Sequence, residues 1–284
     1  MTNAPAMGAG LTRESLVRDL RALGIGAGEV LLVHASLRRV GWVNGGAAEV
    51  VAALREVLGE PGTLVVPTQT ADNSDTSRQH LARIAGMSDD EVQRFRAAMP
   101  PFDAQTTSAT GMGQIAEQVR CTPGAVRSTH PQTSFAALGP LAAPLLAGHA
   151  PDCHLGEESP LAQLYKAGAR LLLLGVDYSA CCAFHLGEYR YTATPPIQPY
   201  GCVVTANGRA QWRRYYDVVL DDSDFRDLGA AFEATGQVIR GTVGSANCRL
   251  AEVVAAVDFA TNWLAEHRHL PDSRPSQRAW RPHS

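Results

Sequence analysis

The sequence predicts an α/β protein with a largely parallel central sheet and a C-terminal portion richer in strands. Two short apolar runs, at 30–34 and 62–67, enclose a helical spacing of apolar residues at 47–58, which is the order of a βαβ unit. A third apolar run, at 170–176, has the length of a buried strand and is too short to cross a membrane. From 200 to 220 the pattern becomes typical of β-strands.

A helix is predicted ahead of the βαβ unit. Thr12 can cap its N-terminus, and Leu16, Leu20 and Leu23 supply its apolar face. Gly24 marks its end.

A polar insertion at 68–108 interrupts the α/β pattern. Within it, 88–98 reads as an exposed helix, and the word MPPFD at 99–103 predicts a rigid turn. Insertions of this size after a strand are usually lids or disordered excursions, and we expect a lid over the site.

The remaining segments complete a single domain from 11 to 270. We expect a disordered N-terminus at 1–10 and a loose tail at 271–284. Between them the sequence predicts a helix at 111–120, an irregular segment at 123–139, a short helix at 142–147, a helix opening at Ser159, a hairpin at Asn207-Gly208 and a last helix at 250–267.

Composition is that of a globular protein with a sizeable core. The 284 residues are 45% hydrophobic and 19% charged, and a net charge of -3 does not suggest a nucleic-acid partner. No signal peptide or membrane-spanning segment is recognisable, so we expect a cytoplasmic protein without a membrane partner. Adjacent cysteines at 181 and 182 favour reduced thiols over a disulfide framework.

The segment at 168–190, GARLLLLGVDYSACCAFHLGEYR, is the strongest candidate for chemistry. Loops at the carboxyl ends of buried strands are where α/β proteins place their sites. His185 and Glu188 lie three residues apart there and would share a face if a helix begins at this point. A carboxylate beside an imidazole can fix its tautomer and raise its basicity, although a capping or core histidine is the alternative.

A glycine-rich loop follows the first strand. Residues 34–46 contain Ser36, Gly41, Gly45 and Gly46 before a helix, so their backbone N–H groups could face a phosphate. The loop matches neither the Walker sequence nor GxGxxG, and an ordinary strand-to-helix turn remains open.

Other polar residues lie near strand ends. His130 precedes a proline in a loop rich in hydroxyls and could bind a ligand or cap a turn. Asp72 and Asp75 follow a strand and are candidates for contacting a cationic substrate, whereas 89–91 reads as a solvated acidic face.

Metal chemistry is not expected. The two sets of possible ligands are Cys181, Cys182, His185 and Glu188, and His149, Cys153 and His154. Neither has a standard zinc spacing. A hydrolase with Cys181 or Cys182 as nucleophile stays open, while the serine-hydrolase word GxSxG is absent.

Seven words in order resemble the aminoglycoside 3-N-acetyltransferase family, also called the antibiotic N-acetyltransferases. They are VHASLRRVGWVNGGAAEVVAAL at 33–54, GTLVVPTQTADNSDTS at 62–77, MPPFD at 99–103, GMGQIAEQVR at 111–120, GAVRSTHPQTSFAALGP at 124–140, ESPLAQLY at 158–165 and LLLLGVDYSACCAFHLGEYR at 171–190. The TADNSDTS and MPPFD segments look most like the actinobacterial branch.

The resemblance implies a three-layer α/β sandwich that differs from the common GNAT acetyltransferase fold. It also implies acetyl transfer from acetyl-CoA to an amine of an aminoglycoside, a polycationic antibiotic, most often its 3-amino group. His185 would be the catalytic histidine and Glu188 its acid. The implied cofactor-binding residues are His34, Ala35, Ser36, Leu37, Arg38, Val40, Gly41, Gly45, Ser128 and His130.

The expected mechanism is direct transfer with His185 as general base, because an ammonium must lose a proton before it can attack a thioester. Glu188 is the first candidate to orient this base, and Asp177 or an acid between 217 and 224 is the alternative. Asp72, Asp75, Asp177 and Glu188 are the acids expected to bind the ammonium groups of the substrate.

Several alternatives stay open at this point. The same chemistry could act on another amine, such as a 2′-amino group, or on a different antibiotic. From other classes come the Cys/His hydrolase and a non-catalytic protein that binds CoA or an antibiotic. A homodimer is possible.

Overall fold

The computed structural model describes residues 10–109 and 111–268, so the expectations for 1–9 and 269–284 lie outside the described residues. Its centre is a seven-stranded sheet in the order β3-β4-β2-β1-β5-β9-β8. The three central strands, β2 (Thr63–Pro67), β1 (Val30–Ala35) and β5 (Arg170–Leu174), are parallel. The pairs at either side are antiparallel: β3 (Val126–Arg127) with β4 (Phe135–Leu138), and β9 (Ala246–Glu252) with β8 (Ile239–Val243).

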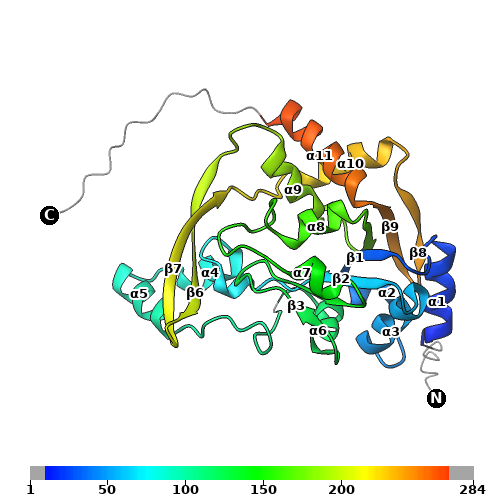
Figure 1. Ribbon diagram of the computed structural model, residues 1–284, viewed down its shortest axis with the longest axis horizontal. Coiled ribbons are helices and arrows are strands. Elements are labelled where there is room, and N and C mark those ends of the chain that lie inside the picture. The colour runs from blue at the N-terminus through cyan, green and yellow to red at the C-terminus, as the bar shows by residue number, and fades with distance from the viewer. Residues whose placement is uncertain (1–9, 110, 269–284) are drawn as a thin grey trace, which may run out of the picture.

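Helices cover both faces of this sheet, which gives the three layers that were expected (Figure 1). One face carries α1 (Arg13–Ala22), α3 (Ala47–Leu58) and α6 (Gln114–Cys121), and the other carries α7 (Ala142–Leu146), α8 (Pro160–Lys166), α9 (Ala183–Arg190), α10 (Phe225–Ala234) and α11 (Val253–His267). The remaining helical segments are α2 (Leu37–Val40), η1 (Ala71–Asn73), α4 (Arg78–Ile84), α5 (Asp89–Ala98) and η2 (Tyr178–Ala180).

Successive residues of the central strands point into two different cores. Leu32, Leu171 and Leu173 pack toward α8, α9 and α11, whereas Leu31 and Leu172 pack toward α1 and α3. Side chains alternate along a strand, so a strand that is buried on both faces must be apolar throughout. This explains why 30–34 and 170–174 read as unbroken apolar runs in the sequence.

A long two-stranded hairpin stands at one end of the sheet (Figure 1). It consists of β6 (Ile197–Ala206) and β7 (Arg209–Val218), and its turn is Asn207-Gly208, where both residues have positive φ. This conformation is typical of the Asn-Gly turn that the sequence predicts. The 68–108 insertion lies beside this hairpin, because Asn73 Nδ2 donates to the Val203 carbonyl at 2.9 Å.

Three element predictions were wrong. The 123–139 segment contains the short strands β3 and β4, and residues 250–252 belong to β9, so the last helix begins at Val253. The helix expected at 111–120 begins later, at Gln114.

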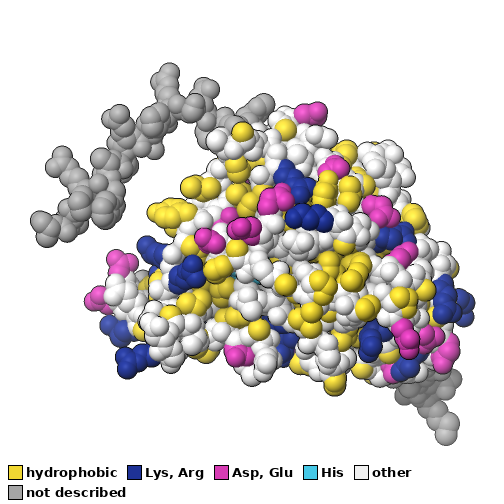
Figure 2. Space-filling model, in the orientation of Figure 1, with side chains coloured by type: hydrophobic (Ala, Val, Ile, Leu, Met, Phe, Trp, Pro, Cys, Tyr) yellow, Lys and Arg dark blue, Asp and Glu magenta, His cyan; other side chains and the backbone are white. Residues whose placement is uncertain are grey.

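The surface carries charges of both signs. Figure 2 shows acidic and basic side chains interspersed on the face seen there. Among the described residues, no helix has the length and apolarity needed to span a membrane.

Candidate active site

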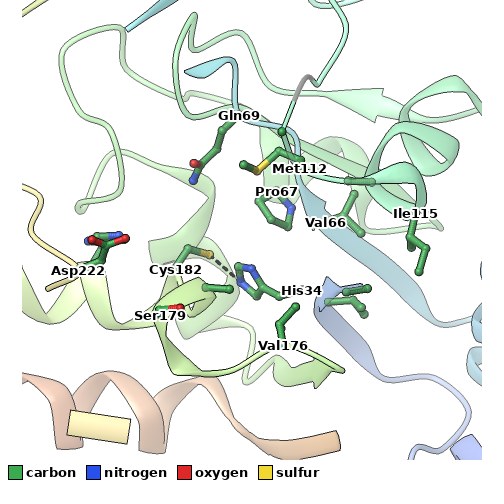
Figure 3. A pocket seen from close by; sticks show the side chains of 16 residues that line it. His34, Val66, Pro67, Gln69, Met112, Ile115, Val176, Ser179, Cys182 and Asp222 are labelled. Atoms are coloured by element: carbon green, nitrogen blue, oxygen red, sulfur yellow. Dashed lines mark hydrogen bonds between the residues drawn. The ribbon is translucent and has the colours of Figure 1, made fainter. Parts of the chain in front are cut away.

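A cavity of about 300 Å³ opens at the carboxyl ends of the three parallel strands. β1 contributes His34 and Ala35, and β2 contributes Pro67 and is followed by Gln69. The segment after β5 contributes Val176, Ser179, Ala180, Cys182 and His185, and the rest of the wall comes from α6 and its approach and from Asp222 (Figure 3). Strand ends of this kind are the usual place for chemistry in α/β proteins.

Helix α9 brings His185 and Glu188 together. His185 Nδ1 lies 2.6 Å from Glu188 Oε2, and their side chains are 16% and 1% exposed. A carboxylate accepts a hydrogen bond from Nδ1–H, which leaves Nε2 of a neutral ring as the acceptor. The His185 ring also packs against Phe225, with centroids 4.7 Å apart. The pair therefore has the geometry of an oriented base at a cavity wall.

The second oxygen of Glu188 is also occupied. Glu188 Oε1 accepts the Asp221 N–H at 2.9 Å and Arg268 Nη1 at 2.6 Å. Sequence reasoning missed Arg268, which is 80 residues from Glu188 and follows the last turn of α11. No local pattern in the sequence marks such a distant partner.

His34 and Cys182 form a second contact in the cavity, drawn as a dashed line in Figure 3. Cys182 Sγ lies 3.1 Å from His34 Nε2. Burial lowers the pKa of His34 to about 3, with a smaller effect from nearby His185. Burial raises the pKa of Cys182 well above its usual value, and that of Cys181 to about 12. Both thiols therefore stay neutral at pH 7, and a neutral thiol is a poor nucleophile.

The loop after β1 borders a neighbouring cavity of about 490 Å³. Of the residues predicted to bind the cofactor, this cavity is lined by Ala35, Ser36, Leu37, Arg38 and Gly41. Ala35, Gly111 and Met112 line both cavities, which are therefore contiguous. Val40 is fully buried, and Gly45, at φ 83°, lies against Glu49.

Ser128 and His130 lie deeper in the protein. They are 1% and 0% exposed. Ser128 Oγ contacts His149 Nδ1 at 3.0 Å, and His130 Nδ1 accepts the N–H groups of Gln132 and Thr133. Neither residue lines the two cavities just described.

The predicted substrate acids are spread around the site. Asp72 Oδ2 pairs with Arg83 at 3.3 Å, and Asp75 Oδ1 accepts the Gly201 N–H at 2.7 Å. Asp177 caps η2 and pairs with Arg226 at 3.2 Å.

None of these three lines the cavity that contains His185, whereas Asp222 does. The Asp222 side chain is 44% exposed, and its nearest cation is Arg78 at 3.6 Å. From the sequence, Asp222 was only one of the acids between 217 and 224 that could orient His185.

Two of the candidate metal ligands, His149 and His154, form hydrogen bonds within the protein instead. His149 Nε2 donates toward the carbonyls of Cys153 and His154, and His154 Nδ1 lies 2.7 Å from Asp217 Oδ2. Across residues 10–109 and 111–268, no group of three or more His, Cys, Asp or Glu side chains could hold a metal ion.

Comparison with known proteins agrees with this architecture. The family described as aminoglycoside 3-N-acetyltransferase matches residues 32–265. The chain is 40% identical to the aminoglycoside N(3′)-acetyltransferase-like protein YokD of Bacillus subtilis, over 89% of this chain and 92% of that protein. It is 37% identical to aminoglycoside N(3)-acetyltransferase VII of Streptomyces paromomycinus, over 90% and 92%. The resemblance to an actinobacterial branch stays a prediction, because the chain matches both the Bacillus protein and the Streptomyces protein.

Solved structures give the same result. The crystal structure of YokD superposes with a TM-score of 0.85 at 38% identity, covering 91% of this chain and 95% of that one. The structure of AAC-IIIb with CoASH superposes with a TM-score of 0.79 at 31% identity, covering 91% and 97%. The family match and the identity to these relatives show that the chain belongs to the aminoglycoside 3-N-acetyltransferase family of acyltransferases.

Proposed function

We propose that this protein transfers the acetyl group of acetyl-CoA to an amino group of an aminoglycoside, at the 3-amino position, and so confers resistance to the antibiotic. The observation that carries the proposal is the His185–Glu188 pair at the wall of the cavity. Family membership supports the reaction class and the cosubstrate.

His185 would act as general base in a direct transfer. Its Nε2 takes a proton from the substrate ammonium, and the free amine then attacks the thioester carbon. The new C–N bond forms as the C–S bond breaks. The nitrogen gives up a second proton as the amide forms, the departing thiolate takes up one proton and leaves as the CoA thiol, and the other proton is released to solvent. Ionised Glu188 stabilises the imidazolium that forms, because the carboxylate lies against Nδ1.

The two contiguous cavities suggest how the substrates share the site. The cavity beside Ser36, Arg38 and Gly41 would hold CoA, with Arg38 as an exposed cation near its phosphates. The cavity beside His185 and Asp222 would hold the amine. We propose Asp222 as the acid nearest the reacting amine, with Asp72, Asp75 and Asp177 contributing at longer range to the attraction of a polycation.

The test combines turnover with product analysis. Purified protein should release free thiol from acetyl-CoA when an aminoglycoside is added, and mass spectrometry with NMR of the product should locate the acetyl group on N3. His185→Ala should lose at least about 100-fold in kcat/KM while it still binds CoA. Undiminished turnover by His185→Ala would contradict the base role, and acetylation of another amine would correct the position.

The other classes are less well supported. A Cys-dependent hydrolase needs an ionised thiol, whereas burial keeps Cys181 and Cys182 neutral. A non-catalytic binding protein would leave the His185–Glu188 pair without a role. Release of thiol from acetyl-CoA would exclude this alternative, and ligand binding without thiol release would support it. The cytoplasmic location, the homodimer and the absence of a nucleic-acid partner stay predictions.

A further inference from the structure

Arg268 joins two carboxylates and one backbone carbonyl beside the proposed base. Its Nε and Nη2 bind the two oxygens of Asp224 at 2.8 and 2.7 Å. Its Nη2 also donates to the Asp221 carbonyl at 2.6 Å, and its Nη1 donates to Glu188 Oε1 at 2.6 Å. Four hydrogen bonds thus hold a guanidinium whose side chain is only 18% exposed.

The fold brings Arg268 to this place through α11. Helix α11 packs beside α9 (Figure 1). Arg268 is the C-cap residue that follows the last residue of α11, His267. The tip of α11 therefore reaches the Glu188 side chain from outside the cavity. Arg268 does not line the cavity and touches no reacting atom in the proposed reaction.

We propose that Arg268 is a positioning residue that keeps Glu188 ionised and oriented, and thereby sets the pH range in which His185 acts as a base. The inference rests on the proposed role of His185. A carboxylate that is 1% exposed would be costly to ionise without a cation or several donors. Arg268 and the Asp221 N–H occupy Oε1, which leaves Oε2 directed at His185 Nδ1.

The positive charge of Arg268 also opposes protonation of His185. It partly neutralises the negative charge of Glu188, which would otherwise stabilise an imidazolium, and it repels an imidazolium directly. Both effects favour the neutral ring that can accept a proton. Without Arg268 the His185–Glu188 pair would bind its proton more tightly. Since coupled groups titrate together, the shift belongs to the pair.

The other ionisable groups around His185 are distributed as follows. His34 on β1 and Cys182 before α9 are neutral at pH 7 because of burial. Asp221 and Asp222 approach from the segment after β7 and favour the imidazolium, while Arg78 on α4 pairs with Asp222 at 3.6 Å. In the described part of the chain, Arg268 is the cation that is hydrogen-bonded to Glu188.

The test removes the charge and keeps a hydrogen-bond donor. Arg268→Gln should raise the pKa of the acidic limb of kcat/KM against pH by about one unit, since a charge at this range shifts pKa values by one to three units. The ring of His185, followed by NMR in histidine-labelled protein and assigned by its loss in His185→Ala, should show the same upward shift. Arg268→Lys keeps the charge and should stay near the wild-type value.

Asp224→Asn is the matched control. It removes another Arg268 partner but leaves the bond to Glu188. The pKa of the acidic limb of kcat/KM should therefore stay unchanged or fall. An unshifted limb and an unshifted His185 titration in folded Arg268→Gln would overturn the inference. If Arg268→Gln does not fold, a rise of a unit or more in Arg268→Lys would overturn it. These results are separate from the tests of the proposed function, which are thiol release by the wild-type protein and the loss of turnover in His185→Ala.

Discussion

Cys182 is the residue that most directly separates the two chemical interpretations of the site. It contacts His34 and lines the cavity, so its position alone would suit a nucleophile. Its thiol is 4% exposed, and burial raises its pKa well above the usual value. His34 cannot activate it as an imidazolium partner near pH 7, because the pKa of His34 is lowered to about 3.

We therefore expect Cys182→Ala to retain kcat/KM within about tenfold, because acetyl transfer would not pass through an acyl-enzyme. Cys181→Ala, at a fully buried position away from the cavity wall, is the matched control for packing effects. The measurement is thiol release under steady-state conditions, together with mass spectrometry of the enzyme mixed with acetyl-CoA alone. An acetylated Cys182 in that spectrum would reverse this expectation.

At the scale of residues, the sequence predicted local pairs well and distant pairs poorly. His185 and Glu188 are three positions apart, so helix geometry alone placed them together. Arg268 and Asp221 reach Glu188 only through the packing of α11 and of the segment after β7. Asp75 was expected to face a substrate, but its Oδ1 binds the backbone of Gly201 on β6, which no local pattern indicates.

Helix α9 is the element on which the site depends, and one glycine fixes its distance from α11. A Cβ at Gly187 would lie 3.0 Å from both Ala260 Cβ and the Thr261 backbone nitrogen. Glycine has a low helix propensity, so Gly187 by itself destabilises α9 slightly. Its contacts show what it permits in return: a close approach of two helix backbones.

Gly187→Leu should consequently push α9 away from α11. Overpacking of a buried site costs roughly 1–3 kcal/mol, and the displacement would also move His185. We expect a lower free energy of unfolding in urea and a loss of kcat/KM larger than the loss of CoA affinity. Ala230→Leu, at an exposed position of α10, is the control and should change stability by less than about 0.5 kcal/mol. Wild-type stability in Gly187→Leu would show that this interface yields.

Elements with strong periodicity were predicted closely, and very short strands were not. Helix α3 has the predicted bounds, and β1 and β5 were recognised from their apolar runs. Strands β3 and β4 have two and four residues, too few to show an alternating pattern. The end of β9 was read as helix because its apolar residues run on into those of α11.

At the scale of the whole molecule, a buried polar cluster connects the hairpin to α9. Asp217 on β7 accepts the Tyr189 hydroxyl of α9 at 2.6 Å and the His154 ring at 2.7 Å. His149 lies next to this cluster, with its Nε2 2.9 Å from the His154 carbonyl oxygen, and is 4% exposed. The contact between Asp217 and His154 joins segments that are 63 residues apart in the chain.

The buried histidines make the stability of the whole fold depend on pH. Burial lowers the pKa of His34 to about 3 and that of His149 to about 4, whereas an unfolded histidine titrates near about 6.5. Below pH 6.5 the unfolded chain therefore binds more protons than the folded one, and stability falls as the pH falls. Each such group contributes on the order of 1.4 kcal/mol per pH unit until its folded pKa is reached.

We expect the free energy of unfolding to decrease between pH 6.5 and pH 4.5, and His149→Gln to lose roughly 2 kcal/mol less over that interval than the wild type. The variant should be less stable at pH 7, because the hydrogen bond with Ser128 and those to the carbonyls of Cys153 and His154 are weakened. Urea titrations at a series of pH values give both quantities, and His267→Gln, at an exposed position at the end of α11, should keep the wild-type slope. Equal slopes for the wild type and His149→Gln would mean that His149 is protonated in the folded protein, against the burial and hydrogen bonding that hold it neutral.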